Sequence, residues 1–208
     1  MNTRITGLVL TVAPIATLLM WLLTPLGQEG PDIASDRMAA VMAAATDADG
    51  MKLFGLLAMV FSLFYVAAFL HWANDLKGGK LGVLAVVGSL HLVVGLAGAL
   101  AEVAFYGAAA KAVADLGQAG MATGMTYWAA GVALGSAGTG LMMLGSAVIG
   151  VAAYVQKAAN IIPCVLLIAF GLIGVYGAAY AFEETFMAIP YIGISASYVA
   201  LGITMLRK

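Results

Sequence analysis

The sequence predicts an all-α, polytopic membrane protein, a single transmembrane helical bundle over residues 1–208 that crosses the bilayer six times. Of its 208 residues, 63% are hydrophobic and only 9% are charged, and the mean hydropathy is +1.05. A soluble domain carries about 25% charged residues, so most of this surface must face lipid. A membrane span needs about 20 apolar residues, and the chain has six separate stretches of that kind.

The six predicted spans are separated by short polar or glycine-containing loops. They cover residues 6–24, 53–73, 81–107, 126–154, 161–182 and 187–206. The first resembles a signal peptide, because Arg4 precedes its apolar core. Its apolar stretch is longer than that of a signal peptide and ends in TPLGQEGP without a small-residue cleavage pattern. We therefore expect it to be retained as the first helix.

The charges of the loops predict that both termini are cytoplasmic. With the N-terminus inside, the cytoplasmic side holds Arg4, Lys77, Lys80, Lys157, Arg207 and Lys208. The outer side then keeps Arg37 and Lys111, with Lys52 at the outer edge of the second span. An excess of basic residues in cytoplasmic loops is the usual bias of membrane proteins. Most acidic residues fall on the outer side in this orientation.

The longest loop contains a predicted short helix. The stretch DIASDRMAAVMAAAT, residues 32–46, is rich in alanine and follows Pro31. A proline at the first helical position and acids such as Asp32 and Asp36 in the first turns favour a helix start. The segment is too short to span, so we expect it to lie on the outer membrane surface or to cap the bundle.

The chain has 26 glycines, and they are concentrated within the predicted spans. Small residues allow membrane helices to approach closely. The glycines expected to pack helices are Gly131, Gly135 and Gly138 in the fourth span and Gly171 and Gly174 in the fifth. Packing within one chain is the favoured interpretation, and a homo-oligomer formed through the fourth span is the alternative.

Two ionisable residues, His91 and Glu102, interrupt the third span. At about 100° per residue, a spacing of eleven residues places them within about 20° of one another on a helix. Charged groups at membrane depth are costly when they face lipid. We therefore expect this face, with Tyr106 one turn beyond Glu102, to point into the bundle.

The fifth span offers a counterpart near the same outer end. Tyr176, Tyr180 and Glu184 recur at four-residue spacing and form one stripe. We expect them to line a polar pocket near the outer leaflet together with Glu102 and Tyr106. The alternative is an interfacial belt of tyrosines and a solvated turn at Glu184.

Several kinds of site are not expected. The single cysteine, Cys164, excludes an intramolecular disulfide and a cysteine metal cluster, and no zinc or phosphate-binding motif is present. His71 and His91 differ by roughly 10 Å in depth, which does not suit two axial ligands of one haem. The net charge of −1 argues against nucleic acid as a partner. We expect no metal, cofactor or catalytic site, and hence no enzyme.

Four stretches in the first half of the chain carry a resemblance. They are RITGLVL, DRMAAVMAAATDADG, LFGLLAMVFSLFYVAAFLHW and the basic turn LKGGKLG. In hydropathy and turns they resemble a family of small bacterial six-helix membrane proteins catalogued as a domain of unknown function. The resemblance implies a bacterial cytoplasmic membrane and six spans, and it implies no activity or cofactor.

Three functions remain open, all with the lipid bilayer as the first partner. The leading hypothesis is a structural or interaction bundle that self-associates or serves as an accessory subunit of a membrane complex. The second is a small proton- or cation-coupled transporter or channel that uses Glu102 and His91. The third is a protein that binds a lipid or another hydrophobic ligand.

Overall fold

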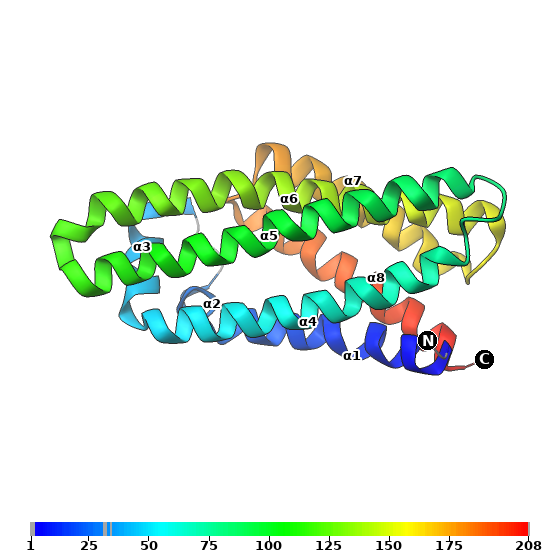
Figure 1. Ribbon diagram of the computed structural model, residues 1–208, viewed down its shortest axis with the longest axis horizontal. Helices are drawn as coiled ribbons and strands as arrows, with labels where there is room; N and C mark the ends of the chain where they lie inside the picture. Colours follow the sequence, from blue (N-terminus) through cyan, green and yellow to red (C-terminus); the bar gives the residue numbers. More distant parts are fainter. Residues whose placement is uncertain (1–2, 31–32, 34, 208) are drawn as a thin grey trace.

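A computed structural model describes residues 3–30, 33 and 35–207 of the chain, which are helical almost throughout (Figure 1). Pro31, Asp32 and Lys208 lie outside the described residues. The elements in chain order are α1 (Thr3–Leu22), α2 (Pro25–Glu29), α3 (Arg37–Thr46), α4 (Ala48–Asn74), α5 (Gly82–Leu116), the 3₁₀ helix η2 (Gly117–Gly120), α6 (Met121–Gln156), α7 (Ile161–Tyr180), the 3₁₀ helix η3 (Thr185–Met187) and α8 (Ala188–Leu206).

The all-α class is confirmed, and within the described residues five helical runs are long and apolar enough to cross a membrane. They are Thr3–Leu22, Ala48–Asn74, Gly82–Gln156, Ile161–Tyr180 and Thr185–Leu206. The third run is 75 residues long and contains α5, η2 and α6. These two long helices fold back on one another as a hairpin (Figure 1). Such a set of helices is typical of a multi-pass membrane protein.

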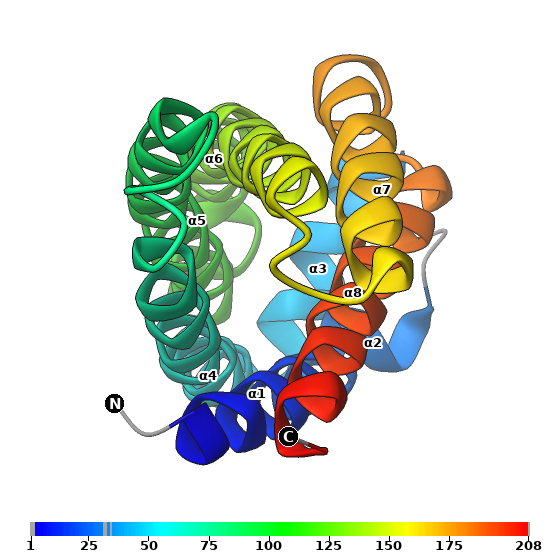
Figure 2. The same ribbon diagram turned by 90° about the vertical axis from the view of Figure 1, so that its right-hand side faces the viewer.

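The long helices form a closed ring. Helix α1 packs against α4, and each further long helix packs against the next along the chain until α8 returns to α1. Figure 2 views this ring along the helices. The neighbours in the ring are also neighbours in the sequence. Because the ring is closed, it surrounds an interior that the side chains must fill or leave open.

The two ends of the ring carry different segments. Both termini and the α4–α5 and α6–α7 connections lie at one end, which we call the terminal end (Figure 1). Helices α2 and α3 and the tip of the α5–α6 hairpin lie at the opposite, hairpin end (Figure 1). The basic residues Lys77, Lys157 and Arg207 therefore share the terminal end, whereas Arg37 and Lys111 lie toward the hairpin end.

The α5–α6 hairpin is longer than predicted. The expected spans stop at residue 107 and resume at residue 126, but α5 continues to Leu116 and α6 begins at Met121. At 1.5 Å per residue each helix is over 50 Å long, against a hydrocarbon core of about 30 Å. The reason is that the segment KAVADL is a good helix former, and the first break comes at Gly117, whose φ of +57° suits glycine.

Helix α3 begins later than the sequence suggested and packs on the bundle. The predicted start lies at Pro31 and Asp32, whereas the observed N-cap is Asp36, whose carboxylate accepts from the Met38 and Ala39 amides at 3.1 Å. A side-chain cap of this kind satisfies amides that have no partner within the helix. The buried face of α3 packs with Tyr106 and Trp128, so α3 caps the bundle.

The contact between α5 and α6 follows a repeat of 3.5 residues. Buried positions of α5 recur at Ala85, Leu92, Ala99 and Tyr106, which is the spacing of a left-handed supercoil. The two backbones approach most closely at Gly95, where an added Cβ would lie 2.5 Å from the carbonyl oxygen of Gly138.

Helix α7 approaches α6 in the same manner. A Cβ added at Gly171 would lie 2.6 Å from the carbonyl oxygen of Met143, and one at Gly174 would lie 2.5 Å from Cγ of Met143. At Gly131 an added Cβ would lie 2.9 Å from the Tyr106 ring. These glycines therefore face other helices of the same chain.

Candidate functional site

The ring encloses a cavity of about 640 Å³. Its walls come from α1, α4, α5, α6 and α8, and α2 and the α7–α8 connection close it toward the hairpin end. Most lining side chains are apolar, among them Leu18, Met59, Leu96, Met143 and Ile194. A few polar groups in an apolar cavity of this size is the usual composition of a small-molecule site.

Glu102 is the only carboxylic acid that α5 contributes to the cavity wall. Its side chain is 8% exposed, and its carboxyl group lies where a Cβ on Gly135 would stand. Tyr106, one turn further along α5, forms a hydrogen bond with this carboxyl group. The glycine of α6 thus leaves room for a carboxyl group inside the bundle, where it avoids lipid.

Trp128 stands beside these two residues. Its indole is 3% exposed and stacks on the ring of Tyr106, with the centroids 4.2 Å apart and the planes at 24°. It also lines the cavity, and its Nε1 is buried with no acceptor in the described part of the chain. An unsatisfied buried donor costs about 1–3 kcal/mol, so this indole is held in place by packing and not by a hydrogen bond of Nε1.

Two hydrogen bonds connect α6 and α8 beside the cavity. The hydroxyl oxygens of Tyr191 and Thr139 lie 2.9 Å apart, and those of Tyr198 and Ser146 lie 2.6 Å apart. Ser146 donates its own proton to the carbonyl oxygen of Met142 at 2.8 Å. Tyr198 is therefore the donor to Ser146, and both tyrosine rings are held against α6.

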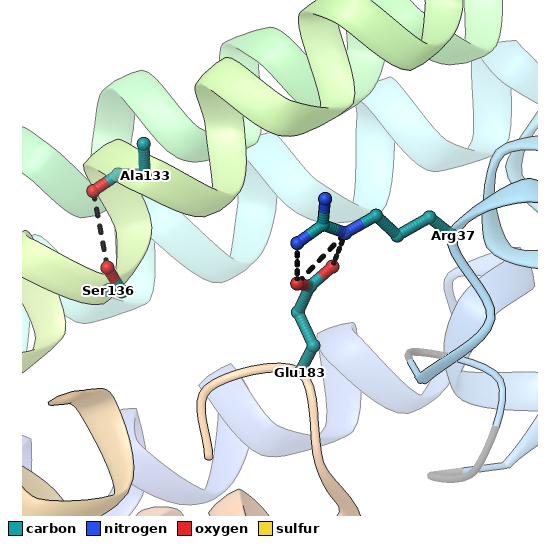
Figure 3. A network of polar contacts seen from close by, with 4 residues as sticks. All are labelled: Arg37, Ala133, Ser136 and Glu183. Atoms are coloured by element: carbon teal, nitrogen blue, oxygen red, sulfur yellow. Dashed lines mark hydrogen bonds and ion pairs between the residues drawn. The ribbon is translucent and has the colours of Figure 1, made fainter. Parts of the chain in front are cut away.

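An ion pair spans the hairpin end of the cavity. Arg37, the first residue of α3, donates from Nε to Oε1 of Glu183 at 2.8 Å and from Nη2 to Oε2 (Figure 3). This bidentate geometry is the favoured one for arginine and carboxylate, and the hydrogen bond and charge of Glu183 raise the pKa of Arg37. Glu183 lines the cavity, so the ion pair ties α3 to the α7–α8 connection at the hairpin end of the cavity.

His91 does not lie with Glu102 in the cavity wall, although the two were expected to share one buried face. It is partly buried, and its Nδ1 lies 2.8 Å from the carbonyl oxygen of Val87 on the same helix. The prediction assumed a straight helix of 3.6 residues per turn. In the observed 3.5-residue seam, eleven residues correspond to a rotation of about 50° relative to the seam, so His91 falls beside the buried face.

Tyr176 and Tyr180 also lie outside the cavity, so the expected pocket is corrected at these positions. They are 59% and 78% exposed and contact one another on the outer face of α7, with ring centroids 5.2 Å apart. Glu184 does line the cavity, because α7 ends at Tyr180 and the chain then turns inward. Outward tyrosines near a helix end fit the alternative of an interfacial belt.

Among the cavity residues that the sequence argument missed are Trp128, Tyr191 and Tyr198. One signal was available for the tyrosines. Thr139 and Ser146 are seven residues apart on α6, and Tyr191 and Tyr198 are seven residues apart on α8. Polar groups repeated over two turns on two helices are the pattern expected for paired hydrogen bonds across an interface.

No family model matches this chain, and neither the curated proteins nor the solved structures give a match. The resemblance to the six-helix bacterial family therefore stays a prediction. In the described part of the chain, no three His, Cys, Asp or Glu residues come together in a way that would hold a metal ion. The function must be inferred from the cavity itself.

Proposed function

We propose that the chain crosses a cell membrane six times and binds a small amphipathic molecule within its ring of helices. Six crossings follow if α5 and α6 each span once. Both termini then lie on one side, as they do in Figure 1. The basic residues at the terminal end favour the cytoplasm for that side, which gives a multi-pass protein of a cytoplasmic membrane.

The observation that carries the proposal is the carboxyl group within the apolar cavity. The Glu102 carboxyl group and the Trp128 indole lie on adjacent helices, on either side of Tyr106. A ligand with a hydrogen-bond donor or a positive charge at its polar end would pair with Glu102. The apolar remainder of the molecule would lie against Met59, Leu96 and their neighbours.

The two other hypotheses from the sequence rank lower. A structural or accessory bundle requires no internal cavity with a buried carboxyl group. A relay through Glu102 and His91 is weakened because His91 bonds to its own helix outside the cavity. Neither hypothesis includes catalysis, and we propose no enzymatic activity.

Trp128 fluorescence provides the test. The substitutions Trp21→Phe and Trp72→Phe leave Trp128 as the only tryptophan. We expect a bromoalkylamine, whose bromine quenches indole on contact, to quench Trp128 saturably in lipid nanodiscs. Glu102→Gln should weaken this quenching, because the buried carboxylate no longer pairs with the amine.

The matched control separates the cavity from the surrounding lipid. Tyr176→Trp, in a chain whose three native tryptophans are phenylalanine, places the reporter on the exposed face of α7. Partition into lipid should quench this reporter without saturation. If Trp128 shows the same unsaturable quenching, the cavity does not bind the amphiphile and the proposal is wrong.

A further inference from the structure

A second cavity, of about 540 Å³, lies at the terminal end of the ring. It is lined by residues from the ends of α1, α4, α6 and α8, including Asp75, Gln156 and Thr204. Ala158 and Ala159, which connect α6 to α7, also line it. This cavity therefore lies at the opposite end of the ring from the hairpin end of the first cavity.

The two cavities come within one helical turn of each other on α8. Tyr198 lines the first cavity and Leu201 lines the second. Three residues of α-helix correspond to about 4.5 Å along the axis. On α4 the nearest lining residues are Tyr65 and His71, about 9 Å apart along the axis. The barrier between the cavities is therefore thinnest beside α8 and α4.

A cluster of aromatic side chains contributes to this barrier. Phe69 is fully buried between the two cavities, with its ring edge-on to Tyr198 at 4.8 Å between centroids and stacked on Trp72 at 5.5 Å. Tyr65 lies against Tyr198 at 5.2 Å. The polar link is the hydrogen bond from Tyr198 to Ser146. Rotation of these side chains would move the barrier without breaking a backbone hydrogen bond.

We propose that the two cavities are halves of one pathway, which opens to each side in turn at the barrier of Phe69 and Tyr198 and carries an amphipathic molecule across the membrane. Only the chemistry of the molecule rests on the proposed function. Polar groups line the route, with Glu102 and Ser195 in the first cavity and Asp75 and Gln156 in the second.

Cysteine reactivity from each side tests the pathway. In a Cys164→Ala chain, which removes the single native cysteine, Ser195→Cys reports on the first cavity and Thr204→Cys on the second. Both positions lie on α8. The probe is a cationic, membrane-impermeant methanethiosulfonate applied to sealed vesicles of known orientation. Gln118→Cys at the hairpin end and Gly78→Cys at the terminal end verify that orientation.

We expect Ser195→Cys to react from both sides and Thr204→Cys to react fastest from the terminal end. Tyr198→Phe keeps the ring but removes the hydrogen bond to Ser146. The loss of one hydrogen bond corresponds to a shift of about fivefold in an equilibrium, so the rate at Ser195→Cys from the terminal end should rise by about that factor. Leu172→Cys, on the exposed face of α7, controls for reagent that crosses the lipid.

Two results would overturn the pathway. The first is that Ser195→Cys never reacts from the terminal end, even with Tyr198→Phe. The second is that it reacts from that end only with Tyr198→Phe, because the native barrier would then stay closed. Saturable quenching of Trp128 combined with either result would leave a binding protein without transport, so the two proposals fail separately.

Discussion

At the level of single residues, Glu102 and Gly135 form a steric pair. A Cβ at Gly135 would overlap the Glu102 carboxyl group, so we expect Gly135→Ala to lower the melting temperature in detergent. Glu102→Ala removes the obstacle, and the double variant should therefore recover most of the loss. Contacting residues show coupling free energies on the order of 1 kcal/mol, which thermal unfolding followed by circular dichroism can measure.

Gly138→Ala is the matched control for this cycle. Its Cβ would lie 2.7 Å from the carbonyl oxygen of Gly95, and a backbone atom cannot rotate away as a side chain can. Glu102→Ala should leave the destabilisation by Gly138→Ala unchanged. Equal rescue of both glycine variants would show that Glu102→Ala stabilises the bundle in general, and the steric pairing would be refuted.

How far the site could be predicted depended on the type of residue. Glu102 was found because an ionisable group in a span needs a buried environment, and Tyr106 followed from its spacing. Trp128 could not be distinguished from core packing, because an aromatic residue in an apolar run carries no sign of an unsatisfied donor. His91 was misplaced because the supercoil, which determines the buried face, exists only once α5 and α6 pack together.

At the level of elements, the ion pair between α3 and the α7–α8 connection should control access to the cavity. Its side chains are 50% and 21% exposed for Arg37 and Glu183, and exposed pairs contribute about 0–1 kcal/mol. We therefore expect Arg37→Gln to change the melting temperature little. It should raise the rate at which Ser195→Cys reacts from the hairpin end, and high salt should have a similar effect.

Lys111→Gln is the control for Arg37→Gln. It breaks the exposed pair of Lys111 with Asp115, which is 2.8 Å long and lies within α5, and so removes a similar interaction that connects no separate elements. Reactivity at Ser195→Cys should stay unchanged in this variant. Equal acceleration by both substitutions would mean that charge at the hairpin end, and not the link from α3, sets the access rate.

The sequence predicted the positions of the helices more accurately than the residues at which they begin and end. Hydropathy located each long helix, because lipid-facing residues must be apolar whichever helix packs beside them. It could not locate the tip of the α5–α6 hairpin, since an alanine-rich helix can continue into water beyond the membrane. Helix α3 begins at Arg37 because Asp36 caps it. From the sequence alone, Asp32 earlier in the loop was an equally suitable cap.

At the level of the whole molecule, the closed ring bears on the question of oligomers. Small-residue faces are compatible with contacts within one chain or between chains, so the sequence left both open. In the structure, Gly138 faces α5 and Gly171 faces α6. The faces that the alternative interpretation used to join two copies are thus in contact within one chain. We therefore expect the extracted particle to be a monomer.

The mass of the particle tests this expectation together with ligand binding. Native mass spectrometry of protein released from nanodiscs should give the mass of one chain, with an added mass from a retained molecule. Glu102→Gln should reduce the occupancy of that molecule without changing the mass of the protein itself, because the substitution alters the polar end of the cavity and no outer surface. A stable dimer would redirect attention to the exposed face of α7 at Tyr176 and Tyr180. Equal occupancy in the native chain and in Glu102→Gln would place the retained molecule outside the cavity.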